Sequence, residues 1–205
     1  QLKKRFEARD LGPAKHILGI KLEQEKDAIT LSMPAYIAEL LDRSKMLDAN
    51  AVKSPAEVGP KLPRSDPAAT GEMIGSIRYR SCCGAFLWLA LTCRPDIMAI
   101  TNKLCRHVAK PTENAIRAAR RLLRYLVGTI DHSITYSAES GDTLTTYSDS
   151  DWGDDIDSRR STTGFCIMLA GAAIDWQSKL QPTVAMSTSE AEAMALAASV
   201  NETEY

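Results

Sequence analysis

The chain has 205 residues, of which 44% are hydrophobic and 25% are charged, and its formal net charge at pH 7 is −1. This balance is typical of a folded protein of one or two domains and excludes an extensively disordered chain. A net charge this small excludes a globally basic nucleic-acid-binding protein, so any affinity for phosphates has to come from a local cluster of cations. The longest apolar run, Ala85–Leu91, is far too short for a membrane span, and we expect no contact with a membrane.

The five cysteines indicate an intracellular protein. Their number is odd and their spacing is not that of a metal site. The first residues show neither an initiator Met nor a signal-peptide pattern. We therefore predict reduced thiols, most of them small core residues. Because both ends read as the middle of a longer sequence, we also expect the chain to be a fragment.

The first third of the chain is predicted to form a β-hairpin and a helix. Apolar and polar residues alternate in Leu18–Leu22 and again in Ile29–Met33, with a polar turn between them at Glu25–Asp27. This period of two predicts a hairpin with one buried face. Pro34 then begins a helix, at a position where its missing N–H group costs nothing. Residues 52–70 contain four prolines and no periodicity, which indicates a loop or linker.

Three helices are predicted in the middle of the chain. The first covers residues 77–91, and the second begins at Pro95 with an apolar stripe on one face. The third begins near Pro111, with Thr112 as its cap, and ends at Gly128.

After Gly128 the apolar pattern changes from a helical period to alternation. Strands are predicted at residues 133–136, 144–149, 164–169 and 173–177, and an alanine-rich helix at 187–200. We predict that residues from about 143 form a three-stranded antiparallel sheet followed by one helix. The expected fold class is therefore α+β.

Acidic residues in this last part are candidate ligands of a divalent metal ion. Asp149 ends a predicted strand, which we expect to be the central strand of its sheet, and Glu192 lies in the first turns of the helix. Mg²⁺ prefers carboxylate oxygens. For either residue alone, a solvated surface position is the alternative. Asp151 points the same way as Asp149 in an extended strand, so either can be the ligand. Glu190 lies about 200° around the helix from Glu192, so one of the two is a charge favoured by the helix dipole. Residues 154–157 are expected to be a solvated loop.

A basic stripe is predicted on the helix that ends at Gly128. Its members are Arg117, Arg120, Arg121 and Arg124. Their spacing of three, four and seven residues places them on one face, opposite the apolar face. Such a stripe can follow the phosphates of a nucleic acid and bind them in a salt-dependent way. An ordinary solvated helix face explains the same spacing equally well.

Several ordered motifs carry a family resemblance. In the C-terminal part they are Tyr147–Trp152, Asp157–Phe165, Trp176–Lys179 and Gln181–Glu192. These segments resemble the start of the RNase H domain in the Pol polyprotein of copia-type LTR retrotransposons. Upstream, Phe6–Gly12 and Leu18–Ile20 resemble the C-terminal part of the reverse transcriptase, with Leu18–Ile20 similar to the element that holds the primer end. Thr92–Ile97 and Arg124–Thr129 resemble the helical segment between the two enzymes.

The resemblance implies an organisation and a pair of activities. It implies a C-terminal part of a reverse transcriptase (residues 1–75), a helical thumb or connection segment (76–130) and the N-terminal part of a truncated RNase H-like α/β unit (131–205). The parent enzyme would synthesise DNA on RNA and cleave the RNA of RNA–DNA hybrids with Mg²⁺. By position, Asp149 and Glu192 match two of its catalytic and metal-binding carboxylates.

The resemblance also implies that this chain is incomplete as an enzyme. No Tyr-x-Asp-Asp motif of the polymerase is present, and the remaining RNase H ligands would lie after Tyr205. We expect a fragment that is inactive alone, with an RNA–DNA hybrid or template–primer duplex and the other segments of the polyprotein as partners. The parent would act in a cytoplasmic virus-like particle. The alternative is a non-catalytic remnant that binds nucleic acid or acts as a scaffold.

Overall fold

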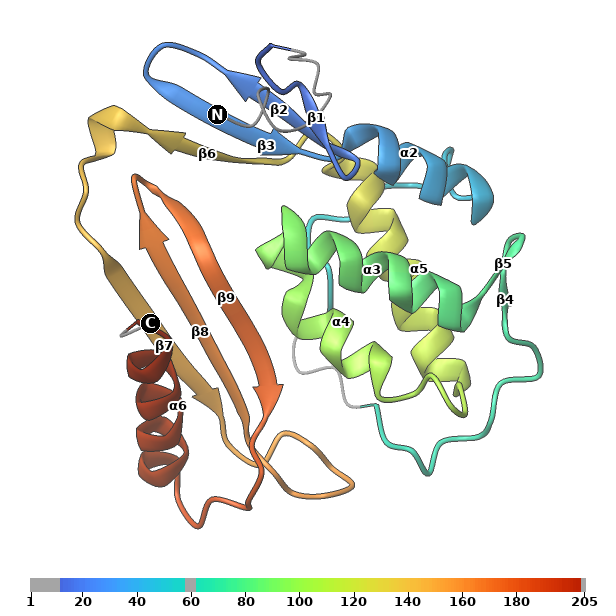
Figure 1. The fold of residues 1–205 in the computed structure, drawn as a ribbon. Helices are drawn as coiled ribbons and strands as arrows, with labels where there is room; N and C mark the ends of the chain where they lie inside the picture. The colour runs from blue at the N-terminus through green and yellow to red at the C-terminus, as the bar shows by residue number, and fades with distance from the viewer. Residues whose placement is uncertain (1–11, 58–61, 204–205) are drawn as a thin grey trace, which may run out of the picture.

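The computed structural model describes residues 12–57 and 62–203, so Phe6–Gly12, one of the resemblance segments, lies almost entirely outside the described residues. The N-terminal sheet has the strand order β1-β2-β3-β6 and lies at the top of Figure 1. Its strands are β1 (His16–Ile17), β2 (Ile20–Gln24), β3 (Ala28–Ser32) and β6 (Ser133–Ser137). The predicted hairpin is formed by β2 and β3. Leu18 does not belong to its buried face, because it lies in the β1–β2 turn with φ 52° and is 78% exposed.

Strand β6 joins this sheet from more than a hundred residues further along the chain. It runs antiparallel to β3, with Ser133 opposite Ser32 and Ser137 opposite Ala28. The hydroxyl groups of Thr30 and Thr135 lie 2.9 Å apart across the pair. The predicted strand at 133–136 therefore pairs with the N-terminal hairpin and not with the strands that follow it.

Four helices pack beside this sheet and contain most of the core. They are α2 (Pro34–Arg43), α3 (Tyr79–Thr92), α4 (Met98–Cys105) and α5 (Glu113–Gly128), with a 3-10 turn η1 (Pro95–Ile97) before α4. A short hairpin of β4 (Met73–Ile74) and β5 (Ile77–Arg78) precedes α3, which is why this helix begins two residues later than predicted. The helix starts follow the sequence signals: Pro34 is in the first turn of α2, and the Thr112 side chain accepts a hydrogen bond from the Ala115 N–H at the start of α5.

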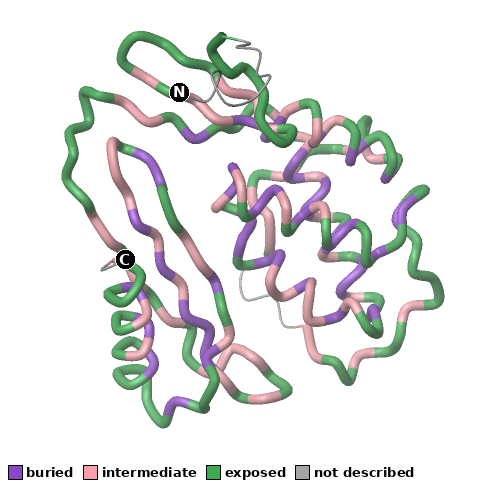
Figure 2. Tube along the Cα trace, in the orientation of Figure 1, coloured by how far each residue is buried: buried purple, intermediate pink, exposed green. Residues whose placement is uncertain are grey.

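Many of the buried segments, purple in Figure 2, lie on the helices beside the N-terminal sheet, and their apolar residues form one core cluster. Phe86 and Leu89 of α3 and Leu122 and Leu123 of α5 are completely buried, as is Ile37 of α2. Burying a side chain of this size contributes about 1.5–3 kcal/mol. The five cysteines are free thiols, and three of them are buried. None of the described helices is long and apolar enough to cross a membrane.

A buried arginine joins the α3–α4 connection to the end of α5. Arg94 is 1% exposed. Its Nε and Nη2 donate to both carboxylate oxygens of Asp96, at 2.9 and 2.7 Å. Its Nη1 and Nη2 donate to the carbonyl and hydroxyl oxygens of Thr129, at 3.0 and 2.7 Å. The Tyr125 hydroxyl donates to Asp96 at 2.8 Å, and the guanidinium lies 5.5 Å from the centre of the Tyr125 ring. The charge is thus fully paired, as burial requires.

The C-terminal part is a three-stranded antiparallel sheet followed by one helix, as predicted. Its strands are β7 (Thr145–Asp151), β8 (Thr162–Leu169) and β9 (Ala172–Leu180), in the order β7-β8-β9, and the helix is α6 (Thr188–Thr203). A 3-10 turn, η2 (Ala138–Ser140), lies between β6 and β7. Helix α6 covers one face of the sheet and the other helices lie beyond the opposite face (Figure 1). Trp176 of β9 connects the two parts, since its Nε1 donates to the Ala90 carbonyl of α3 at 2.6 Å.

We predict that Gly75→Ala strongly destabilises the fold. Gly75 has φ +60°, and a Cβ built there would lie 2.2 Å from the carbonyl oxygen of Ser44. The left-handed conformation and the overlap together should lower the free energy of unfolding by about 3 kcal/mol, measured by urea titration. Gly84→Ala is the control, because Gly84 lies in α3 and an added Cβ would meet no atom within 4 Å apart from its chain neighbours and the local helix backbone. That variant should be more stable than the parent by roughly 1 kcal/mol. Equal effects of the two changes would contradict this account.

The Arg94 network predicts a specific dependence of stability on pH. Burial opposes ionisation of Asp96, but the hydrogen bonds and charge of Arg94 outweigh it and lower the pKa of the carboxyl group. A lowered pKa contributes stability above the unfolded value, about 3.9, which is lost as the pH falls through the folded value. Asp96→Asn should therefore cost roughly 3 kcal/mol at pH 7, since it leaves a buried cation without its partner. The difference from the parent should shrink in acid. Asp142→Asn, at an exposed position, should change neither quantity.

Candidate metal-binding carboxylates and basic surface

The two faces of β7 have different surroundings. The Thr146 hydroxyl lies 3.1 Å from the Thr203 hydroxyl of α6, so the face that carries Thr146, Ser148 and Ser150 is directed toward this helix. Asp149 alternates with these residues and is exposed on the opposite face. Asp151 shares its face, as the alternation predicted. The strand was expected at the centre of its sheet, and this expectation was wrong, because β7 is an edge strand.

Glu192 lies on the flank of α6 that is nearest to β7. It precedes Thr203 by eleven residues, or about three turns, so the two residues lie on the same side of the helix. Thr203 contacts β7, so the helical period places Glu192 on the flank of α6 next to this edge strand. Its side chain is exposed. Asp149 is thus on the face of β7 turned away from α6, and Glu192 is on the neighbouring flank of the helix. Whether they share one ion stays a prediction.

Glu190 has a different role, at the start of α6. Its carboxylate accepts a hydrogen bond from the Met186 N–H at 2.6 Å, and its own N–H donates to the Ser187 hydroxyl at 3.1 Å. This is a capping arrangement, in which side chains satisfy donors that the helix itself leaves unpaired. One of the two glutamates was expected to serve the helix end, and it is Glu190.

Asp151 is close to a further carboxylate and a lysine. Partial burial of its carboxyl group, and next the negative charge of Asp154, raise the pKa of Asp151 above its ordinary value, while Lys103 acts in the opposite direction. Asp154 is itself paired with Lys103 at 2.5 Å. Because Lys103 comes from α4, the helical part of the chain contributes a positive charge beside the carboxylates of β7.

The donor set fits a weakly held ion better than a closed metal site. Among the described residues, no group of three or more His, Cys, Asp or Glu side chains is placed to hold a metal ion. Mg²⁺ commonly takes one or two protein carboxylates and keeps several waters. Asp149 or Asp151 together with Glu192 supplies that number, so the carboxylates present are compatible with Mg²⁺ in type and number.

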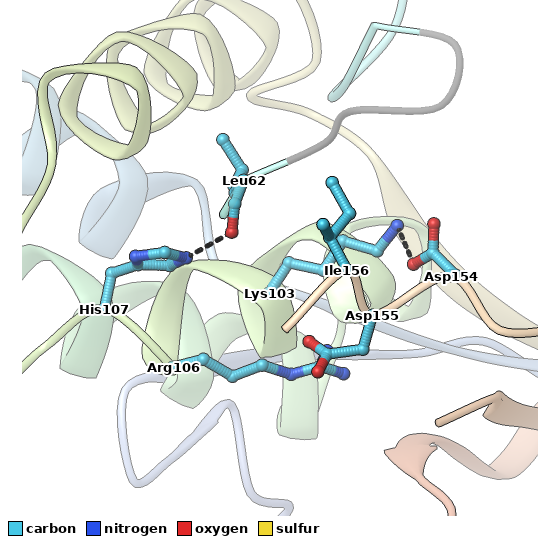
Figure 3. A pocket seen from close by; sticks show the side chains of 7 residues that line it. All are labelled: Leu62, Lys103, Arg106, His107, Asp154, Asp155 and Ile156. Atoms are coloured by element: carbon cyan, nitrogen blue, oxygen red, sulfur yellow. Dashed lines mark hydrogen bonds and ion pairs between the residues drawn. The ribbon is translucent and has the colours of Figure 1, made fainter. Parts of the chain in front are cut away.

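The loop after β7 (residues 152–161, the β7–β8 loop) is only partly solvated. Ile156 and Asp157 are exposed, as expected, whereas Asp154 and Asp155 are not. Asp154 and Asp155 form ion pairs with Lys103 and Arg106 of α4, at 2.5 and 3.0 Å. The four side chains are only 11–16% exposed. Figure 3 shows them around a small cavity together with His107, whose Nε2 lies 3.0 Å from the Leu62 carbonyl oxygen.

These ion pairs were missed because each joins residues about fifty positions apart. Lys103 and Arg106 are spaced by one helical turn, which was the only local signal for them. Nothing in the sequence indicates which acidic loop they meet.

The basic stripe of α5 is divided by the structure. Arg117 and Arg120 are exposed, whereas Arg121 and Arg124 are half-buried. Arg121 donates to the Ser54 hydroxyl at 3.0 Å, and Arg124 donates to the Asn50 carbonyl at 2.6 Å. The segment before residue 58 therefore covers half of the stripe, and the expectation of four exposed arginines holds for two. Binding of nucleic acid by any of them stays a prediction.

No protein-family model and no solved structure matches this sequence. An uncharacterized mitochondrial protein of Arabidopsis thaliana is 35% identical over 202 residues, which are 98% of this chain and 82% of that protein. The retrovirus-related Pol polyprotein from transposon TNT 1-94 of Nicotiana tabacum is 37% identical over 95% of this chain, and the one from transposon RE1 of A. thaliana is 35% identical over all of it.

This chain spans 15% and 14% of the lengths of those two polyproteins. The similarity extends over nearly the whole chain in both cases, so it is not confined to one motif. The chain therefore belongs to the family of retrovirus-related Pol polyproteins from transposons, and it corresponds to a segment of them.

Proposed function

We propose that the chain is the junction of a reverse transcriptase and an RNase H within such a polyprotein. Residues 1–75 would be the end of the polymerase, 76–130 the helical connection, and 131–205 the start of the RNase H-like unit. The pairing of β6 with β3 refines this division, because β6 then belongs structurally to the first part. The parent activities would be RNA-dependent DNA synthesis and Mg²⁺-dependent cleavage of RNA in RNA–DNA hybrids.

The observation that carries the proposal is the relation between β7 and α6. A strand with Asp149 and Asp151 on one face lies against a helix whose near flank carries Glu192. These residues would hold the Mg²⁺ ion, which would supply an activated water and neutralise charge on the phosphate. The chain's own contribution would be to present carboxylates from β7 and from α6 to one ion at the exposed edge of β7. The small residue Gly164 lies opposite Asp149 on β8 and leaves the sheet face beside this carboxylate free of a side chain.

The proposal includes that this segment is inactive without the rest of the polyprotein. In-line displacement at phosphorus commonly uses two ions about 3.5–4 Å apart, and the described carboxylates offer no set of three. Other segments of the polyprotein would supply the missing ligands and would be partners of this one. An RNA–DNA hybrid or a template–primer duplex would be the nucleic-acid partner.

A second candidate is a non-catalytic module that binds nucleic acid or acts as a scaffold. The exposed positions of Arg117 and Arg120 on α5 favour it, since two cations about one turn apart can contact successive phosphates. This candidate requires no metal ion and no further ligands.

We predict no measurable cleavage of an RNA–DNA hybrid by residues 1–205, and Mg²⁺-dependent cleavage when the following polyprotein segment is present. In the longer chain, Asp149→Asn or Glu192→Gln should abolish cleavage, measured with a hybrid labelled on its RNA strand. Asp151→Asn tests the alternative ligand. Glu190→Gln is the matched control, because it removes a charge two residues from Glu192 that serves the helix end. Robust cleavage by residues 1–205 alone would show that the site is complete without the following segment.

We also predict that changing Arg117 and Arg120 to Ala weakens binding to an RNA–DNA hybrid. The magnitude of the slope of log K against log salt concentration should fall by about 1.4–1.8, since each lost phosphate contact contributes about 0.7–0.9. Arg43→Ala, on the exposed surface of α2, should leave the slope unchanged. Fluorescence anisotropy over a series of salt concentrations measures both. An unchanged slope in the double variant would show that the two arginines do not bind phosphates and belong to an ordinary solvated helix face.

A further inference from the structure

The β7–β8 loop is an ordered element with its own hydrogen bonds. The N–H of Asp155 donates to the Arg160 carbonyl at 3.2 Å, and the N–H of Arg159 donates to the Asp155 carbonyl at 2.7 Å. The Asp155 carboxylate also accepts from the N–H and the hydroxyl of Ser158. Gly153 and Arg159 have positive φ values, 60° and 59°, which close the loop into a compact turn. The loop can therefore move or dock as a unit.

Charged contacts hold this unit against α4. Asp154 pairs with Lys103 and Asp155 with Arg106 (Figure 3). In the middle of the loop, the Asp157 carboxylate accepts a hydrogen bond from the Arg64 N–H at 3.0 Å. Asp155 takes part in both sets of contacts, because one carboxylate oxygen orders the loop and the other meets Arg106.

The contact with α4 continues onto the sheet itself. The side-chain nitrogen of Asn102 donates to the Ser178 carbonyl of β9 at 2.6 Å, and Arg106 donates to the oxygen of the same Asn102 side chain at 3.4 Å. Arg106 thus connects the loop contact to the sheet contact. The polar face of α4 therefore meets the end of β7 through the loop and meets β9 directly.

We propose that Lys103 and Arg106 form an electrostatic latch that holds the β7–β8 loop, and that they are positioning residues for the carboxylates of β7. The loop begins directly after Asp151, and Asp154, which pairs with Lys103, follows Asp151 by three residues. Movement of the loop away from α4 would therefore change the direction of the Asp151 carboxylate. The latch rests only on the observed contacts, whereas its bearing on metal binding rests on the proposed function.

The latch is tested by trypsin cleavage after Arg159 and Arg160 in the full chain, followed by mass spectrometry under native conditions. Lys103→Gln and Arg106→Gln should each speed cleavage there at least about tenfold, the effect of losing one charged hydrogen bond. Lys110→Gln, at an exposed position after α4, should have no effect. Raising the salt from about 0.1 M to about 1 M shortens the screening length from about 10 Å to about 3 Å. It should speed cleavage of the parent more than that of the variants.

A double-mutant cycle separates the latch from general destabilisation. Lys103→Gln combined with Asp154→Asn should give no more cleavage than the larger of the two single changes. The exchanged pair, Lys103→Asp with Asp154→Lys, should recover part of the protection. Unchanged cleavage in Lys103→Gln, or additive effects in the cycle, would overturn the latch. Urea titration identifies any variant whose whole fold is weakened.

The positioning role is tested in the chain extended by the following polyprotein segment. Lys103→Gln should raise the Mg²⁺ concentration for half-maximal cleavage and leave the KM for the hybrid unchanged, while Lys103→Arg should restore the parent value. An unchanged Mg²⁺ dependence, with faster trypsin cleavage, would retain the latch and overturn the positioning role. If the extended chain has no activity, the proposed function fails, and trypsin cleavage still decides the latch.

Discussion

The enclosed guanidinium of Arg94 is the interaction on which the arrangement of this chain depends. An unpaired charge in that position would cost several kcal/mol, so Asp96, Tyr125 and Thr129 have to surround it. This requirement fixes the turn between α3 and α4 against the end of α5. It also anchors Thr129, the residue directly after α5, from which the chain continues to β6. The Arg-Pro-Asp motif that carried part of the family resemblance is thus explained by a structural need.

Helix α4 has two roles that come from its two faces. Its apolar side, with Ile100 and Leu104, completes the core of the helical part. Its polar side holds the C-terminal sheet through Asn102, Lys103 and Arg106. The contacts are mostly charged or hydrogen-bonded, and Trp176 adds one large aromatic side chain that packs against the core. Contacts of this kind fix the orientation of the C-terminal sheet relative to the helical part. They do so without the large apolar interface that would prevent the two parts from moving relative to each other. Asp151 of β7 directly precedes the loop that makes the charged contacts with α4.

Local chemistry allowed most elements to be predicted, and long-range pairing limited the rest. Pro34 and Thr112 predicted helix starts because their effects act within one turn. The pattern in residues 164–169 and 173–177 predicted two strands, and β8 and β9 are found there. The pairing of β6 with β3 could not be predicted, since the sequence of a five-residue strand does not encode which distant strand it pairs with. The acidic loop was misjudged for a related reason: residues 154 and 155 look solvated until α4 is placed beside them. At the candidate site, the sequence indicated the acidic residues, but the edge position of β7 depended on the sheet order.

The pairing of β3 with β6 has a consequence for how the protein is made. The two strands are separated by about a hundred residues. The N-terminal hairpin therefore cannot pair with β6 until the helices between them have been synthesised. At about 5–20 residues per second on the ribosome, this delay is on the order of ten seconds. During that time the open edge of β3 is available to other strands, including those of neighbouring nascent chains. The helical core, whose contacts are closer in sequence, has time to form first and to bring β6 to its partner.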